Sequence, residues 1–168
     1  AAGPAWRVEY AEAAPSTNAL AADHPEAGLV VVVDHQTAGR GRLDRSWATP
    51  AHVSLTMSAV LEPDLPPERW PLLPLIAGVA VATAVGQRAK LKWPNDVLID
   101  DQKVCGILVE RPAAFPSYAV VGIGINVDQV RSELPLPTAT SLRLAGLDVD
   151  RTELFGAIVA GLGDGLAE

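Results

Sequence analysis

Residues 36–47 combine two glycines, three arginines and a tryptophan in a spacing that suits an anionic ligand. The cations are Arg40, Arg42 and Arg45, and Trp47 follows them two residues later. Glycine lets a backbone approach a ligand closely, and each guanidinium offers a rigid fork of donors that matches a phosphate or a carboxylate. This segment therefore predicts a loop that wraps a nucleotide or an acid, and taken alone it is also compatible with a solvated basic turn.

A second group of polar side chains ends a short predicted strand at residues 92–96, which read Lys-Trp-Pro-Asn-Asp. The amide of Asn95 suits a base edge or a ribose, and Asp96 is placed to orient an incoming amine, although Pro-Asn-Asp is also ordinary turn chemistry. Lys103 follows shortly after. A lysine aimed into a site removes the repulsion between a carboxylate and a phosphate that approach each other, whereas a lysine at a hairpin otherwise commonly faces solvent.

The glycine-containing segments do not match two common nucleotide motifs. The loop lacks the Gly-Lys-Ser/Thr ending of a P-loop, and residues 122–126 contain Gly-x-Gly without the third glycine of a dinucleotide fingerprint. We expect Gly122 and Gly124 to allow close packing on a strand. Cys105 is the single cysteine and cannot form an internal disulfide, so an inert core thiol and a cytoplasmic location are predicted.

The composition is that of a single globular domain with a small ligand. The chain has 168 residues, of which 49% are hydrophobic and 20% charged, with a formal net charge of −7. The negative charge argues against nucleic-acid binding, so the arginine cluster indicates a small anion. The longest apolar stretch, residues 72–85, is interrupted and too short to span a bilayer, so we expect no membrane contact.

Hydrophobic patterning and turn residues predict an alternation of hairpins and helices. Ser16 and Thr17 precede an alanine-rich run, which is typical of a helix N-terminus, and the β-branched run at 28–34 is typical of a strand buried on both faces. The other predicted elements are a loop at 35–50, strands at 53–61, 91–93 and 118–127, a hairpin of 97–99 with 104–110, and helices at 67–86 and 151–166. We therefore expect an α+β fold, a largely antiparallel mixed sheet with helices packed on it.

Taken together and in this order, the motifs resemble those of biotin protein ligases. They are Ser16-Thr17-Asn18, the Gly-Arg-Gly-Arg-x-x-Arg-x-Trp loop, Lys-Trp-Pro-Asn-Asp, Lys103-x-x-Gly-Ile-Leu-x-Glu, and Gly-x-Gly-x-Asn ending at Asn126. The resemblance extends from about residue 6 to the last predicted helix and implies the fold shared by class II aminoacyl-tRNA synthetases and biotin ligases. It also implies an enzyme that uses ATP and Mg²⁺ to form biotinyl-5′-AMP. Such an enzyme then passes the biotinyl group to one lysine of the biotin carboxyl carrier domain of acetyl-CoA carboxylase or a related carboxylase.

The resemblance assigns roles to residues of each motif. The catalytic residues that it implies are Lys103, Arg42 and Asp96. The biotin-binding residues that it implies are Ser16, Thr17, Asn18, Gln36, Gly39, Arg40, Gly41, Arg42, Lys103 and Gly106. The ATP-binding residues that it implies are Arg42, Arg45, Trp47, Lys92, Asn95, Lys103 and Asn126. A urea ring needs both donors and acceptors in a dry pocket, which suits the polar members of the biotin group.

Two other functions remain compatible with parts of the pattern. One is a lipoate or octanoate protein ligase or transferase, which shares the general fold but lacks the arginine-glycine loop, and the other is a non-catalytic biotin- or nucleotide-binding module. We expect residues 1–168 to form one catalytic domain, without an N-terminal DNA-binding domain and with the family's C-terminal small β-barrel absent or truncated. We expect the loop at 39–47 to be mobile when empty and to close over its ligands, because an acyl adenylate hydrolyses readily in water.

Overall fold

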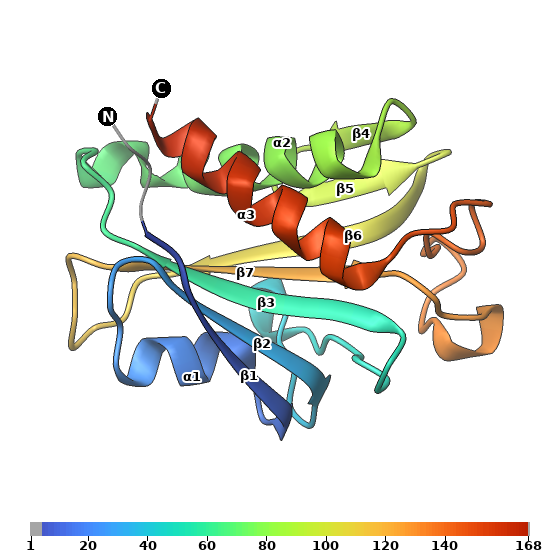
Figure 1. The fold of residues 1–168 in the computed structure, drawn as a ribbon, viewed down its shortest axis with the longest axis horizontal. Coiled ribbons are helices and arrows are strands. Elements are labelled where there is room, and N and C mark those ends of the chain that lie inside the picture. The colour runs from blue at the N-terminus through green and yellow to red at the C-terminus, as the bar shows by residue number, and fades with distance from the viewer. Residues whose placement is uncertain (1–4, 168) are drawn as a thin grey trace.

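Within residues 5–167, which the computed structural model describes, a seven-stranded sheet carries helices on both faces. Figure 1 shows α1 on one face of the sheet and α2 and α3 on the other. The strands are β1 (Arg7–Ala14), β2 (Leu29–Gln36), β3 (Ser54–Leu61), β4 (Ala89–Lys92), β5 (Asp96–Ile99), β6 (Gln102–Glu110) and β7 (Ala119–Asn126). The α-helices are α1 (Thr17–Asp23), α2 (Leu73–Val85) and α3 (Arg151–Ala167), and short 3₁₀ turns lie at Arg42–Asp44, Pro67–Leu72 and Arg131–Glu133.

The sheet is mixed but largely antiparallel. The strand order is β1-β2-β3-β7-β6-β5-β4, and among these neighbours only β1 and β2 run parallel. Asp100 and Asp101 connect β5 to β6 with φ of 50° and 62°, the left-handed values that a two-residue type I′ hairpin turn requires. The predicted α+β architecture and the predicted hairpin are therefore confirmed.

Alternation along the central strands separates a hydrophobic core from a polar surface. On β3, Leu55, Met57 and Ala59 belong to the core that α2 and α3 cover, whereas Thr56 and Ser58 face the side that carries α1. The neighbouring strands β6 and β7 continue this pattern, with glycines on the α1 side: Gly106, Gly122 and Gly124. The centre of the sheet is thus packed on one face and open to small polar groups on the other.

The helix α2 occupies the second part of the helix predicted at residues 67–86, and a 3₁₀ turn, Pro67–Leu72, occupies the first part. Gly86 ends α2 at the predicted place, with φ of 114°. The buried face contains Leu73, Ala77 and Val81, whereas Val79 is 54% exposed. Because the helix is apolar almost all round, its spacing predicted a helix without identifying the face that packs against α3 and the sheet.

Together with the 3₁₀ turn before it, α2 forms a helical segment, Pro67–Val85, with the length and hydropathy of a membrane span. The apolar stretch at residues 72–85, from which no span was predicted, is the shorter C-terminal part of this segment. In the part of the chain that the structure describes, α2 packs against α3 and against β4, β5, β6 and β7. Its buried residues are Leu73, Ala77, Gly78, Ala80 and Val81, and the other residues of the segment are partly or fully exposed.

The strand β1 is the element that the sequence analysis did not predict. Residues Arg7–Ala14 are mostly exposed, and their mixture of charged and small side chains lacks the apolar alternation of a half-buried strand. Parallel pairing with β2 places β1 at the edge of the sheet, where Ala11 and Ala14 contact the smaller apolar cluster near α1. Main-chain pairing defines this strand, and side-chain patterning does not reveal that kind of interaction.

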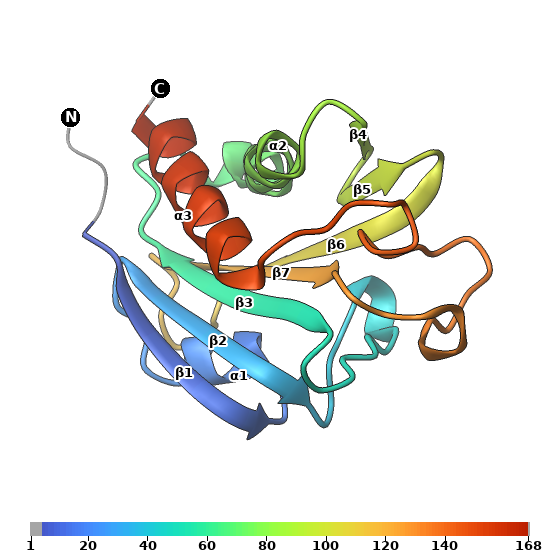
Figure 2. The ribbon, with the colours of Figure 1, turned by 45° about the vertical axis from the view of Figure 1, so that its right-hand side comes forward.

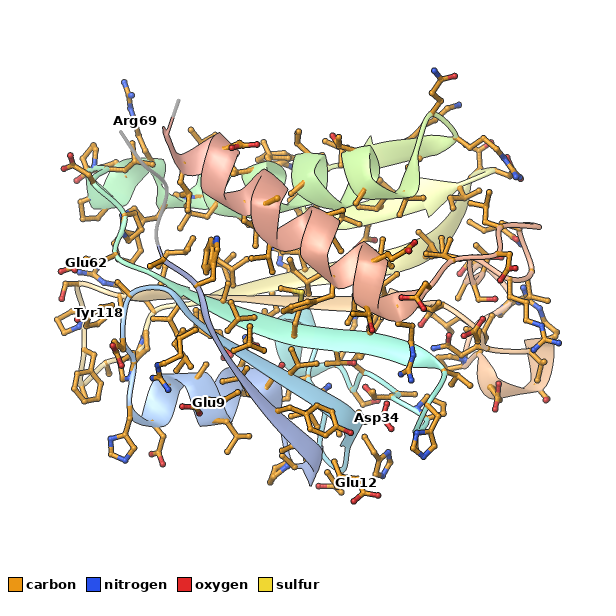
Figure 3. All side chains as sticks on the ribbon, in the orientation of Figure 1. Glu9, Glu12, Asp34, Glu62, Arg69 and Tyr118 are labelled. Carbon is orange, nitrogen blue, oxygen red and sulfur yellow. The ribbon has the colours of Figure 1, made fainter. Side chains whose placement is uncertain are left out.

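Asp34, near the end of β2, ties three segments together at one end of the sheet (Figure 3). Its buried carboxylate accepts hydrogen bonds from the backbone N–H of His52 at 3.1 Å and from Arg151 Nη1 at 2.9 Å. The same Arg151 nitrogen also donates to the carbonyl oxygen of Ser54 at 2.9 Å. The first turn of α3 and the segment that enters β3 are therefore fixed to β2.

Cys105 lies on β6 inside the core, as predicted. Its side chain is fully buried, and desolvation by burial raises the pKa of the thiol far above its usual range, with Lys103 opposing the shift. A buried neutral thiol is a poor nucleophile, so the structure supports an inert packing role.

The thiol should stay unreactive until the protein unfolds. An aromatic disulfide reagent should label Cys105 only in denaturant, and stoichiometric labelling of the native protein would contradict its burial.

The pKa of the Cys105 thiol is higher in the folded protein than in the unfolded chain. Burial of the neutral thiol therefore stabilises the fold fully below about pH 8.5, and this contribution to the free energy of unfolding declines as the pH rises further. Urea unfolding across this range should therefore show a smaller alkaline loss of stability in Cys105→Ala than in the wild type.

Candidate active site

The arginine-glycine segment forms a narrow hairpin on the α1 side of the sheet, which we call the lid (residues 39–47; Figure 2). Trp47 N–H donates to Gly39 O at 2.8 Å, and Gly41 N–H donates to Arg45 O at 2.6 Å. The tip is a 3₁₀ turn in which Leu43 has φ of 56°. The sequence predicts only a loop here, whereas backbone hydrogen bonds hold the two arms of the segment together.

Both ends of the lid are attached to the sheet. Before the lid, the N–H groups of Thr37 and Ala38 donate to Ala14 O and Pro15 O, each at 2.9 Å. After the lid, the turn that leads into β3 is held by Asp34. The hairpin can therefore move as an arm between two fixed points, which is the geometry that a closing lid needs.

Glycines on β6 and β7 form a floor on which larger side chains lie directly. A Cβ atom built on Gly124 would stand 2.5 Å from Trp47 Nε1, and one on Gly106 would stand 3.0 Å from Trp47 Cζ3. A Cβ atom on Gly122 would overlap Asn18 Oδ1. The predicted role of Gly122 and Gly124 in close packing is therefore confirmed, and the groups that they admit come from the lid and α1.

Polar side chains from α1, β2 and β3 meet at one end of this floor. Ser16 caps α1 by accepting a hydrogen bond from Ala19 N–H at 3.4 Å. Gln36 Oε1 accepts from Thr17 N–H at 2.8 Å, and Ser58 Oγ lies 2.7 Å from Thr17 Oγ1. These buried groups offer both donors and acceptors within a few ångströms of each other, which suits a neutral, doubly polar ring.

Two adjoining cavities lie under and beside the lid. The narrow cavity has a volume of about 60 Å³ and is bounded by the polar end and the glycine floor. The wide cavity has a volume of about 340 Å³ and lies between the lid and the segment around residues 92–96. Both cavities are lined by a shared set of residues: Gly41, Arg42, Trp47, Asn95 and Lys103. Because the Trp47 indole rests on the floor, it limits the size of the narrow cavity in this arrangement.

The wide cavity is rich in cations and amides. Arg42, Arg45, Lys92 and Lys103 line it, together with the amides of Asn95 and Asn126. The amides are held in place, since Asn95 Nδ2 donates to Ile107 O at 2.8 Å and Asn126 Nδ2 donates to Thr140 O at 3.0 Å. Cations beside fixed amides suit a polyphosphate attached to a base and a sugar.

Lys103 stands at the junction of the two cavities. Its Nζ lies 2.8 Å from Asp96 Oδ1 and 5.3 Å from the centre of the Trp47 ring. Asp96 was expected to orient an acceptor amine, and in the structure it faces the ammonium of Lys103. An acid in the narrow cavity and a phosphate in the wide cavity would meet beside Lys103 and Arg42.

The structure gathers all but one of the residues singled out from the sequence. Every residue assigned to catalysis, biotin or ATP lines one of the two cavities, with the exception of Gly39. Gly39 lies at the base of the lid, where a Cβ atom would overlap Trp47 O, so the geometry gives it a role in closing the hairpin. Thr56, Ser58 and Glu110 were missed as site residues. On β3, the alternation of Thr56 and Ser58 with apolar neighbours was a usable signal.

Comparisons with known proteins show the family to which the chain belongs. Residues 10–126 match the family model described as the biotin/lipoate A/B protein ligase family. The chain belongs to this family, and the resemblance stated from its motifs is confirmed.

Within the family, the similar proteins are biotin ligases. The chain is 40% identical over 150 residues to the bifunctional ligase/repressor BirA of Bacillus subtilis. This match covers 83% of the chain and 46% of BirA. The chain is 39% identical over 155 residues to the biotin–[acetyl-CoA-carboxylase] ligase of Mycobacterium tuberculosis, which covers 84% of this chain and 57% of that protein. The chain thus spans about half the length of these curated relatives. Among solved structures, biotin protein ligase from Aquifex aeolicus in complex with biotin and ATP matches with a TM-score of 0.82 and 33% identity, covering 95% of this chain and 70% of that one.

The glycine floor makes a prediction about stability. Gly122→Ala should lower the free energy of unfolding by about 1–3 kcal/mol, because the added methyl displaces Asn18 from its buried hydrogen bonds. Gly156→Ala is the matched control, since Gly156 lies on the exposed face of α3 with nothing near its Cβ position, and it should gain up to about 1 kcal/mol. Urea unfolding measures both, and equal effects of the two substitutions would contradict the close approach at Gly122.

Proposed function

We propose that this chain carries the catalytic site of a biotin protein ligase. The site would join biotin to ATP as biotinyl-5′-AMP, with release of pyrophosphate, and then transfer the biotinyl group to a lysine of a carrier domain. The observation that carries the proposal is the junction of a polar, glycine-floored cavity with a cation-lined cavity at Lys103 and Arg42. A junction shared by two cavities suits a reaction between two bound substrates better than the binding of a single ligand.

The first step requires two anions to come into contact. A carboxylate oxygen of biotin attacks the α-phosphorus of ATP, and the bond from that phosphorus to the pyrophosphate oxygen breaks. Lys103 and Arg42, placed between the cavities, would offset the repulsion of carboxylate and phosphate and hold the charge that develops on the α-phosphate. Arg45 and Lys92 line only the wide cavity, where the leaving pyrophosphate would pass.

The second step forms an amide. The amine of the carrier lysine attacks the acyl carbon of the adenylate, AMP leaves, and the amine loses a proton. Asp96 faces an ammonium group already, that of Lys103, so its carboxylate is suited to attract and orient a second amine. The carbonyl of the adenylate would lie near Lys103, which can stabilise the oxyanion of the tetrahedral intermediate.

The lid protects this chemistry from water. Trp47 covers the glycine floor, and Arg40 and Arg42 border the narrow cavity, so the closed hairpin shields the acyl phosphate bond. An adenylate held there would survive until a carrier arrives, whereas an open hairpin would admit water. The two substrates must therefore enter before the lid closes.

The resemblance to biotin ligases implies Mg²⁺ with ATP. Among the described residues, no group of three or more His, Cys, Asp or Glu side chains is placed to hold a metal ion. Asp96 is the only carboxylate among the described residues that line the wide cavity. Mg²⁺ would therefore enter with phosphate oxygens and water as its ligands, and Asp96 would be the carboxylate available to hold it. In that position it would neutralise part of the charge on the leaving pyrophosphate.

The partner that fits the proposal is a biotin carboxyl carrier domain. The Mycobacterium tuberculosis relative is named for acetyl-CoA carboxylase, so the carrier domain of that enzyme is the first substrate to test.

Transfer of biotin to a carrier domain tests the proposed function. The chain, biotin, Mg²⁺ and ATP should label a purified carrier domain, as a streptavidin blot detects, and a carrier whose target lysine is changed to arginine should stay unlabelled. Lipoate in place of biotin should support little ATP–pyrophosphate exchange. Exchange that prefers lipoate, or a wild-type chain that labels no carrier, would contradict the proposal.

Lys103→Ala should reduce biotin-dependent ATP–pyrophosphate exchange by about a hundredfold or more, because it removes one of the two cations at the junction and leaves only Arg42. Lys90→Ala is the control, since Lys90 is an exposed lysine of β4 outside both cavities. Normal exchange in Lys103→Ala would rule out the role given to this lysine.

A further inference from the structure

Glu110, the last residue of β6, connects the lid to the wall of the narrow cavity. Its Oε2 atom accepts hydrogen bonds from Arg40 Nη2 at 3.1 Å and from Asn18 Nδ2 at 2.8 Å. Arg40 belongs to the lid, whereas Asn18 belongs to α1. One carboxylate oxygen therefore contacts a segment that is expected to move and a side chain that lines the ligand cavity.

The ion pair with Arg40 is partly exposed to solvent. The side chains of Arg40 and Glu110 are 51% and 33% exposed. A pair at this exposure contributes little to global stability, because water screens it and two long side chains must be ordered. It is well suited to a contact that forms when the lid closes and breaks when the lid opens.

The hydrogen bond to Asn18 has a different consequence. Asn18 is buried, and its Nδ2 group also donates to Leu108 O at 3.2 Å, so both amide protons are used on the β6 side. Its Oδ1 atom must then face the other way, where Ser58 Oγ lies 2.5 Å away. Glu110 and the carbonyl oxygen of Leu108 thus together fix which end of the Asn18 amide points toward Ser58.

This orientation extends along a chain of polar groups. The Ser58 hydroxyl has one proton and two acceptors within reach, Asn18 Oδ1 and Thr17 Oγ1. Thr17 Oγ1 in turn lies 3.3 Å from Gln36 Oε1. A change in the Asn18 amide would therefore alter the donors and acceptors that the narrow cavity presents to a ligand.

We propose that Glu110 is a positioning residue that latches the closed lid through Arg40 and orients the Asn18 amide for recognition of the ligand's polar ring. The second part rests on the proposed function, because it takes the ligand of the narrow cavity to be biotin. One negative charge connects closure of the lid with recognition of the substrate.

Limited trypsin cleavage of the ligand-free full chain tests the latch without requiring activity. Trypsin cuts after the lid arginines, and Glu110→Gln keeps the size of the side chain while removing its charge. Cleavage within the lid should become about two- to fivefold faster in Glu110→Gln. Glu12→Gln is the matched control, since Glu12 is an exposed residue of the edge strand β1 (Figure 3), and it should cleave at the wild-type rate.

Biotin-dependent ATP–pyrophosphate exchange tests the orientation of Asn18. In Glu110→Gln, the KM for biotin should rise by about ten- to a hundredfold, with a smaller change in kcat, because a ground-state contact is lost. Glu110→Asp keeps the charge and should recover part of both the KM and the cleavage resistance. If Glu110→Gln folds poorly, as a urea unfolding curve would reveal, Glu110→Asp remains the test variant against the same control.

The two roles separate in an Arg40→Gln background. Adding Glu110→Gln there should leave cleavage after Arg42 and Arg45 unchanged, because the latch is already lost, while the KM for biotin rises further. Equal cleavage of Glu110→Gln and Glu12→Gln overturns the latch, and an unchanged KM overturns the orientation of Asn18. A wild-type chain without biotin-dependent exchange overturns the proposed function instead, and the ligand-free cleavage rates still decide the latch.

Discussion

Gly106, Gly122 and Gly124 leave the centre of the sheet without side chains on the face that carries α1, and the rest of the site depends on this bare surface. The Asn18 amide and the Trp47 indole lie directly on it, closer than any Cβ atom would allow. The same strands bury large apolar residues on the opposite face, where α2 and α3 cover them. A two-residue alternation thus produces a rigid floor and a stabilising core from the same strands.

Electrostatics divides the site into two halves. The narrow cavity ends in buried neutral groups that satisfy each other, such as Thr17, Gln36 and Ser58, whereas the wide cavity is lined by arginines and lysines in a chain of net negative charge. Lys103 lies where the halves meet, with its charge balanced by Asp96. This division concentrates positive charge at one place in a chain of net negative charge, which suits a small phosphate ligand better than a polyanion.

The motifs identified most of the site because each one is short and lies at the end of a predictable element. Ser16 at a helix start and Lys103 after a hairpin turn could be placed from local patterns alone. Contacts between residues that are far apart in the sequence could not be placed in this way. Glu110 reaches Arg40 and Asn18 across 70 and 92 residues of sequence, and β1 is defined by main-chain pairing that leaves no apolar period. Likewise, the sequence of α2 predicts a helix but not which face of that helix is buried, because apolar residues lie on every face.

A crystal structure of the chain with a non-hydrolysable biotinyl-adenylate analogue tests the central claim most directly. We expect the ureido ring against Thr17 and Gln36, the acyl chain along the narrow cavity beside Trp47, and the phosphate within hydrogen-bonding distance of Arg42 and Lys103 under a closed lid. A ureido ring bound outside the narrow cavity, or a phosphate distant from Lys103, would contradict the assignment of the two cavities to biotin and nucleotide.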